Sequence, residues 1–152
     1  MPVTYRPDDG IGPESGSAVV LRWSCHPRCV GLARRELRKA LGDWGLSSIE
    51  DLAVLVLSEL LTDAVRYGNV RPGAEIETRY LRVRRGLRIE VSDTVHEFRQ
   101  LMASSSEPDR DPRLRIVDAL ADRWKMNDYF GLGTSAWAEL DFPSQTGAPD
   151  VD

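Results

Sequence analysis

Residues 52–67 constrain the fold more than any other stretch, because they are apolar on almost every side of the helix that their pattern predicts. The segment reads Leu-Ala-Val-Leu-Val-Leu-Ser-Glu-Leu-Leu-Thr-Asp-Ala-Val-Arg-Tyr, and it ends at Gly68, a residue type that commonly follows the last turn of a helix. A helix that is apolar nearly all round is stable only when other elements cover it. We therefore expect this helix to lie at the centre of the core.

The segments on either side supply the other elements of an α+β domain. Apolar residues at spacings of three and four predict an amphipathic helix over 30–44, and a short helix that begins near Pro112 and includes 114–121 is expected. Strands are expected over 18–24, 74–83, 87–92, 123–128 and 135–142. This order predicts a two-layer α+β sandwich, in which a mixed, mostly antiparallel sheet carries about three helices on one face.

The length of 152 residues indicates one domain, which we place at 18–143. Residues 1–17 and 144–152 contain few apolar residues and several Pro and Gly turn signals, so we expect a flexible N-terminal arm and a flexible C-terminal tail. No apolar run is long enough for a membrane span, and no secretory signal is evident, which predicts a cytoplasmic protein. The net charge of −4 argues against direct binding of nucleic acid.

Two cysteines lie close together, at Cys25 and Cys29. With His26 they could be imagined as part of a zinc site, but a closed site takes four ligands and the other histidine, His96, is remote in sequence. We expect both to be unreactive thiols at the end of a strand.

Five arginines cluster around the turn between the strands expected at 74–83 and 87–92: Arg79, Arg82, Arg84, Arg85 and Arg88. A basic patch for an acidic partner is one interpretation. A solvated hairpin face, on which the arginines pack their stems, is favoured. The polar stretch after this hairpin, 94–111, is expected to be a lid or a disordered loop.

The polar residues of the central helix form one stripe, since Glu59, Asp63, Arg66 and Tyr67 are spaced at i, i+4, i+7 and i+8. Carboxylates one turn apart repel each other, so a positive group is expected beside them. Either Arg66 forms an ion pair with Asp63, or the stripe binds a cation or a phosphate group.

The segment 58–68 resembles the N-box of the GHKL (Bergerat-fold) ATP-binding domains. The likeness is to the small bacterial anti-sigma-factor serine kinases of the actinobacterial branch, which are related to histidine-kinase ATPase domains. Other segments agree in the same order, and the resemblance covers 18–143. These segments are 34–44, 91–93, 114–124 and 137–140.

The resemblance implies roles for individual residues. It implies that Glu59 is a general base, that Asp63 binds Mg²⁺ in place of the family's asparagine, and that Arg66 contacts phosphate. It implies that Tyr67 packs on the adenine and that Asp93 accepts a hydrogen bond from the adenine amino group. The ATP-binding residues that it further implies are Arg113, Gly133 and Thr134.

The chain departs from the family where phosphate is bound. Residues 111–114 read Asp-Pro-Arg-Leu in place of a G-R-G-L loop, and 133–135 lack the lysine of a G-K-T segment. Glycine lets backbone N–H groups approach phosphate closely, and proline has no N–H to offer. Asp63 also adds a negative charge beside a triphosphate. We therefore expect the nucleotide binding and kinase activity to be weakened or lost.

These departures favour a regulatory protein that acts by binding another protein. By family analogy the partner is a sigma factor, an anti-sigma-factor antagonist, or both, and homodimers are common. One alternative is an active ATP- and Mg²⁺-dependent protein serine kinase that phosphorylates the antagonist. The other is a scaffolding domain without a role for a nucleotide.

Overall fold

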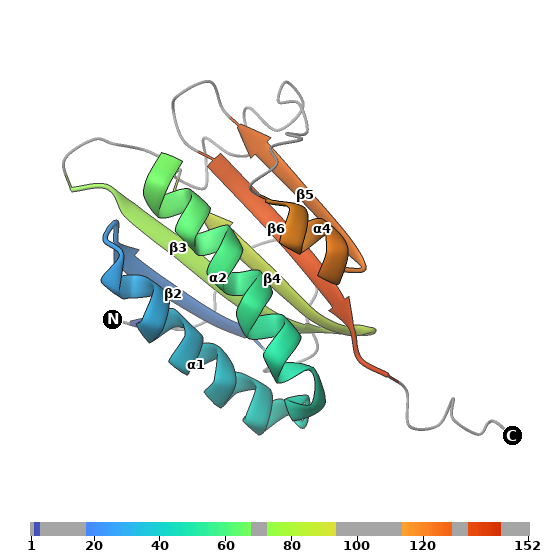
Figure 1. The fold of residues 1–152 in the computed structure, drawn as a ribbon. Coiled ribbons are helices and arrows are strands. Elements are labelled where there is room, and N and C mark those ends of the chain that lie inside the picture. Colours follow the sequence, from blue (N-terminus) through green and yellow to red (C-terminus); the bar gives the residue numbers. More distant parts are fainter. Residues whose placement is uncertain (1, 4–17, 68–72, 94–113, 129–133, 144–152) are drawn as a thin grey trace, which may run out of the picture.

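The computed structural model describes residues 2–3, 18–67, 73–93, 114–128 and 134–143. Its elements, in chain order, are β1 (Pro2–Val3), β2 (Ala18–Ser24), α1 (Arg28–Trp44), the 3₁₀ helix η1 (Ser47–Ile49), α2 (Glu50–Tyr67), β3 (Glu75–Val83), β4 (Gly86–Ser92), α4 (Arg115–Leu120), β5 (Arg123–Asp128) and β6 (Thr134–Asp141). Figure 1 shows how they are arranged.

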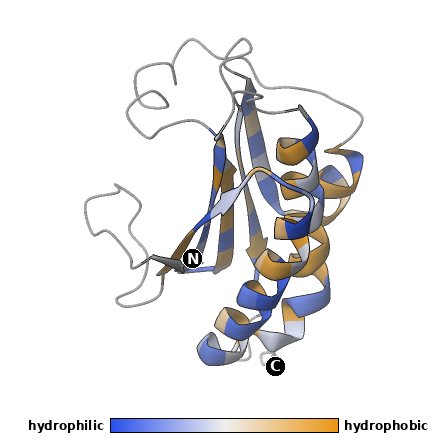
Figure 2. Cartoon of the chain, turned by 90° about the vertical axis from the view of Figure 1, so that its left-hand side faces the viewer, coloured by the Kyte–Doolittle hydropathy of each residue, from blue (hydrophilic) through white to orange (hydrophobic). Residues whose placement is uncertain are grey.

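The strands form one open sheet in the order β1-β2-β3-β4-β6-β5. Every strand pairing in the described part of the chain is antiparallel. The helices α1, α2 and α4 lie together on one side of this sheet (Figure 2). The structure thus confirms a two-layer α+β arrangement and the longer elements to within a few residues. The sheet was expected to be mixed, but its described pairings are all antiparallel.

The expected N-terminal arm contributes one element that the sequence did not predict. Pro2 and Val3 pair with Leu21 and Val20 as the short edge strand β1. Two residues are too few for a hydrophobic alternation to be detected, so no periodicity could have indicated this strand. The remainder of the arm, the loop at 94–111 and the tail at 144–152 lie outside the described residues.

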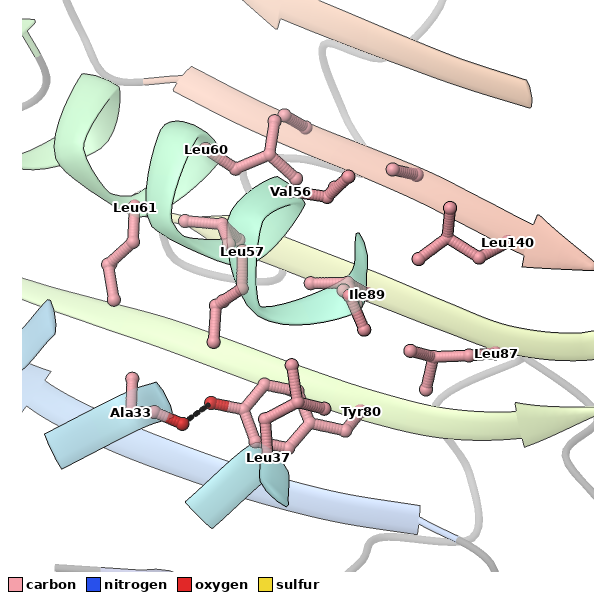
Figure 3. Packing of buried hydrophobic residues seen from close by; sticks show 14 of the residues in the cluster. Ala33, Leu37, Val56, Leu57, Leu60, Leu61, Tyr80, Leu87, Ile89 and Leu140 are labelled. Atoms are coloured by element: carbon pink, nitrogen blue, oxygen red, sulfur yellow. Dashed lines mark hydrogen bonds between the residues drawn. The ribbon is translucent and has the colours of Figure 1, made fainter. Parts of the chain in front are cut away.

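Helix α2 occupies the centre of the helical layer, as predicted, because it contacts α1 on one flank and α4 on the other and lies over β4 and β6. Leu57 and Leu61 are completely buried and point toward the sheet (Figure 3). The burial is not all round, however. Leu52 and Leu55 are 43% and 41% exposed. With only two neighbouring helices and one sheet, the outer stripe of α2 has nothing above it in the described part of the chain.

Tyr80 connects the sheet to the helical layer. Its ring is completely buried, and its hydroxyl donates a hydrogen bond of 2.8 Å to the carbonyl oxygen of Ala33 in α1 (Figure 3). Burial raises the pKa of the Tyr80 phenol well above its ordinary value, so this group remains a donor throughout the physiological pH range. The bond fixes α1 over β3.

The face of the sheet opposite the helices carries a network of charged side chains. Arg88 contacts Glu90 at 2.7 Å and Glu139 at 2.9 Å, and it also lies over the ring of Trp137 at 4.2 Å from the centroid. Arg123 binds Glu139 from the neighbouring strand at 2.8 Å. Burial acts to raise the pKa of Glu139, but the hydrogen bonds from Arg123 and Arg88 outweigh it and lower this pKa below its usual range.

The sheet has two ends, the site end and the hairpin end. At the site end, β2 and β4 finish, β3 and β6 begin, and α2 ends. At the hairpin end, β3 turns into β4 through Arg84 and Arg85, and α1 ends beside them. Helix α1 stops there because Gly45 adopts a left-handed conformation, with φ of 72°, and its N–H bonds back to the carbonyl of Gly42.

Candidate functional site

Asp93 is the most firmly placed of the predicted site residues. It directly follows β4 and is only 5% exposed. Its backbone N–H donates to the carbonyl oxygen of Thr134 at 3.1 Å, and the N–H of Thr134 donates back to the Asp93 Oδ1 atom at 2.5 Å. The structure thus brings together Asp93 and Thr134, two residues of the predicted site that lie far apart in sequence. Their reciprocal bonds hold the carboxylate in one position.

Asp63 and Glu59 lie on successive turns of α2, in the half of the helix that approaches the site end. Asp63 is 7% exposed and Glu59 is half-buried. Desolvation makes a buried carboxylate costly unless other groups interact with it, and Asp63 does have such interactions. A second buried carboxylate, in addition to Asp93, therefore lies on this side of the molecule.

The ion pair between Arg66 and Asp63, one of the two interpretations of the helical stripe, is not formed in the described part of the chain. Arg66 is exposed. It follows Asp63 by three residues, a spacing that permits contact but does not require it, and an exposed arginine gains little from an ion pair in water. The neighbours of Asp63 must therefore come from elsewhere in the fold.

Three of the predicted site residues are described only in part or not at all. Tyr67 is the last residue of α2, and its side chain lies outside the described atoms. Arg113 and Gly133 lie outside the described residues altogether. The phosphate-binding roles that the resemblance implies for Arg113 and Gly133 stay predictions.

Ser58, the residue before Glu59, ties the site helix to α1. Its hydroxyl donates to the carbonyl oxygen of Val54 at 2.7 Å and accepts a hydrogen bond from Arg34 Nη1 at 3.3 Å. Arg34 belongs to the segment 34–44, which carries part of the family resemblance. This bridge fixes α2 relative to α1 at the level of Glu59.

Cys25, which the sequence indicated only as an unreactive thiol at the end of a strand, also lies at the site end. It follows β2 directly, and its backbone N–H bonds to the carbonyl of Ala74 at 3.2 Å, just before β3. Its thiol lies 3.9 Å from the carbonyl oxygen of Val65 in α2. Burial raises the pKa of the Cys25 thiol, and the negative charge of Asp93 raises it further. Cys25 therefore lies beside α2 at the site end, within electrostatic range of the Asp93 carboxylate.

Both cysteines are free thiols, and burial raises the pKa of Cys29 as well. Within the described residues no group of three or more histidine, cysteine or acidic side chains is arranged to hold a metal ion. A signal for the position of Cys25 was available, because a residue that ends a strand lies at the same sheet end as residues that end the other strands of that direction.

Because thiolate is the reactive form of cysteine, the charge of Asp93 is expected to slow alkylation of Cys25. In a Cys29→Ser background, Asp93→Asn should speed the reaction of Cys25 with iodoacetamide at pH 8 by at least about twofold, since removal of the negative charge favours the thiolate. The asparagine side chain keeps an oxygen that can accept the N–H of Thr134. Mass spectrometry of timed samples gives the rate.

The matched control for this experiment is Asp43→Asn, which removes an exposed carboxylate from the hairpin end of α1. It should leave the alkylation rate unchanged. Equal rates in the Asp93→Asn and Asp43→Asn proteins would contradict the electrostatic effect of Asp93 on Cys25.

The chemistry available at the site end follows from its carboxylates. Asp93, fixed by Thr134, suits a ligand that presents an N–H donor, such as an amino group. Asp63 and Glu59 present oxygens of the kind that Mg²⁺ prefers. These three carboxylates therefore suit a ligand that presents a cation and an N–H donor.

Comparisons with known proteins do not assign the chain to a family. No family model matches its sequence, and no curated protein matches it significantly. In the described part of the chain, no helix is both long and apolar enough to cross a membrane.

Proposed function

We propose that this protein is a regulatory protein of the anti-sigma-factor kinase-like type, which acts by binding another protein and whose ATP-binding site has become weak or lost. The observation that carries the proposal is the fixed carboxylate of Asp93 at the end of β4, held by Thr134 at the start of β6. The residues that resemble an N-box lie on α2, which ends at the same end of the sheet.

The part of the proposed site that would bind the adenine ring is supported best. An aspartate at a strand end discriminates an amino-bearing ring only if its carboxylate cannot rotate freely, and the bonds between Asp93 and Thr134 provide that restraint. The low exposure of Asp93 strengthens a hydrogen bond to a ligand, because water competes less for the carboxylate.

The phosphate-binding part is supported least. Asp63 carries a charge that repels phosphate, and only a bound divalent cation could offset this repulsion. ATP with Mg²⁺ would therefore be held at Asp63, Asp93 and Thr134. At 111–114, Pro112 has no backbone N–H to offer a phosphate, and the two glycines that would let the backbone approach it are absent. A fold that keeps its scaffold but loses its phosphate-binding groups is better suited to binding a protein partner than to turnover of ATP.

The partner that we propose is a sigma factor, an anti-sigma-factor antagonist, or both, and the site of action is the cytoplasm. The active-kinase alternative is favoured by one observation, the retention of Glu59 one turn before Asp63 on α2. That kinase would transfer the γ-phosphoryl group of ATP to a serine hydroxyl of the antagonist, with Glu59 positioned to accept the hydroxyl proton. Labelled phosphate on the antagonist after incubation with the wild-type chain would establish the alternative.

Restoring the family's residues tests the proposal by a gain of function. The variant Asp63→Asn, Asp111→Gly, Arg113→Gly is expected to bind Mg-ATP, since it removes the negative charges of Asp63 and Asp111 and gives the backbone at 111 and 113 the freedom of glycine. At a nucleotide concentration tenfold above Kd, binding adds about 1.4 kcal/mol of stability, which raises Tm by roughly 3 to 5 °C. The wild-type chain should shift by no more than about 1 °C at 1 mM Mg-ATP. Differential scanning fluorimetry measures both.

A fourth substitution, Asp93→Asn, in the restored variant is the control, and it should abolish the shift because the amino group of the base loses its acceptor. A shift that persists in the Asp93→Asn protein would contradict the role of Asp93. Absence of any shift in the restored variant would contradict the existence of an ATP pocket at the site end.

A further inference from the structure

A pocket of about 580 Å³ lies at the hairpin end, at the opposite end of the sheet from Asp93. Cavities of this size accommodate a small ligand or a few side chains of a peptide. The residues around it come from the end of α1, the β3–β4 turn and the end of β6: Trp44, Gly45, Leu46, Arg82, Val83, Arg84, Arg85, Gly86, Asp141 and Phe142.

The pocket carries an excess of positive charge. Arg82, Arg84 and Arg85 are exposed, and the described part of the chain provides no ion pair for any of them. The one carboxylate among the described lining residues, Asp141, is bound to Arg123. Its charge is therefore already balanced, and the three arginines remain available for an anionic ligand.

The arginines expected to form one basic cluster thus divide into two groups. Arg79 and Arg88 belong to the charge network on the open face, where Arg79 contacts Glu90 at 3.3 Å. Arg79 is only 4% exposed, so the expected solvated hairpin face does not describe it; both arginines instead pair with carboxylates within the sheet. The other three line the pocket instead, because the strand pairing and the turn direct them to the hairpin end.

The other walls of the pocket are apolar. Trp44 and Phe142 are half-buried, and Leu46 is buried. Their placement is fixed by the backbone, since the N–H of Phe142 donates to the carbonyl of Arg85 at 2.7 Å and the N–H of Leu46 donates to the carbonyl of Leu41 at 2.8 Å. A pocket that is held in this way needs little reorganisation when a ligand enters.

We propose that this pocket binds an acidic peptide segment of a protein partner, with carboxylates on the arginines and an apolar side chain between Trp44 and Phe142. Guanidinium groups pair with carboxylates through two parallel hydrogen bonds, which gives both affinity and orientation. An inorganic anion would leave the apolar walls in contact with water, whereas a peptide covers them as well. The inference deepens the proposed function, on which it rests for the partner being a protein.

A labelled peptide tests the pocket directly. The probe is a fluorescein-labelled peptide of four Glu-Glu-Leu repeats, and fluorescence anisotropy measures its binding to the full chain. Arg84→Ala with Arg85→Ala should weaken binding at least tenfold. The control Arg35→Ala with Arg115→Ala removes the same charge from exposed positions on α1 and α4, and it should change the Kd less than twofold.

Two further peptides test the carboxylates and the apolar side chain of the probe separately. A peptide of Gln-Gln-Leu repeats should not bind measurably, and one of Glu-Glu-Ser repeats should bind at least fivefold more weakly than the probe. Equal loss in the Arg84, Arg85 and the Arg35, Arg115 double variants would overturn the inference, because binding would then follow net charge alone. Displacement of the probe by inorganic phosphate or ATP at equal concentration would overturn it in favour of a small-anion site.

Failure of the pocket inference can be distinguished from failure of the proposed function. If a purified sigma factor or antagonist binds the wild-type chain and the Arg84, Arg85 variant equally well, the pocket inference fails and the proposed function stands. If the probe binds as expected but neither partner does, the pocket inference stands and the proposed function fails.

Discussion

Substitution of Gly86 by alanine is expected to lower the free energy of unfolding by roughly 3 kcal/mol. A Cβ atom at this position would lie 2.3 Å from the carbonyl oxygen of Leu140 and 2.6 Å from the backbone nitrogen of Phe142. Both are main-chain atoms of the neighbouring strand segment, so no side-chain rotation can relieve the contact. The β4–β6 pairing must shift at Gly86 and Asp141, next to the pocket. Urea denaturation followed by circular dichroism measures the loss.

Gly31→Ala is the matched control for this experiment. Gly31 lies in α1, and a Cβ atom there would have no neighbour within 4 Å. Because alanine favours the helix over glycine, the free energy of unfolding should rise by up to about 1 kcal/mol. The two glycine substitutions therefore have opposite expected signs. Similar effects of both would contradict the close approach of β6 to Gly86.

Substitution of Tyr80 by alanine is the second large expected effect, a loss of about 3 to 5 kcal/mol. The ring is completely buried between β3 and α1, and alanine would leave a cavity that the sheet cannot close. Tyr80→Phe keeps the ring and removes only the hydroxyl that bonds to Ala33, so it should cost about 1 kcal/mol. Chemical denaturation of both variants separates packing from the hydrogen bond.

The comparison of the stability losses in Tyr80→Phe and Tyr80→Ala decides between packing and hydrogen bonding. If Tyr80→Phe is as damaging as Tyr80→Ala, the hydroxyl matters more than the volume of the ring, and the packing account of this contact is wrong. Within that account, the Ala33 carbonyl tolerates loss of the hydroxyl because it also belongs to the helical backbone of α1.

The fold was largely predictable because its elements carry strong periodic signals. Residues 52–67 indicated a central helix, and the alternating patterns around Arg84 and Arg85 indicated a hairpin, which the pairing of Val83 with Gly86 confirms. The strand at Pro2–Val3 was not predictable, because its existence depends on the edge of β2 and not on its own residues. The exposure of Leu52 and Leu55 depends likewise on how many helices cover α2.

The sequence indicated several residues of the candidate site, but it did not predict most of the contacts between them. Asp93 and Thr134 were singled out separately through the resemblance, and their hydrogen bonds arise from the register between β4 and β6, which no local pattern encodes. Arg66 and Asp63 have a spacing that suits an ion pair, yet the described structure does not form it. Cys25 was expected at the end of a strand, but its position near Asp93 and Val65 was not predictable, because both residues are distant in sequence.

Our central proposal is that the site end keeps the carboxylates of an ATP pocket but binds the phosphates of ATP weakly or not at all. Isothermal titration of Mg-ATP into the wild-type chain tests it most directly, with the restored Asp63→Asn, Asp111→Gly, Arg113→Gly variant in parallel. We expect a Kd of about 1 mM or weaker for the wild type and at least tenfold tighter binding for the variant. Magnesium-dependent binding of ATP to the wild-type chain with a micromolar Kd would contradict the claim.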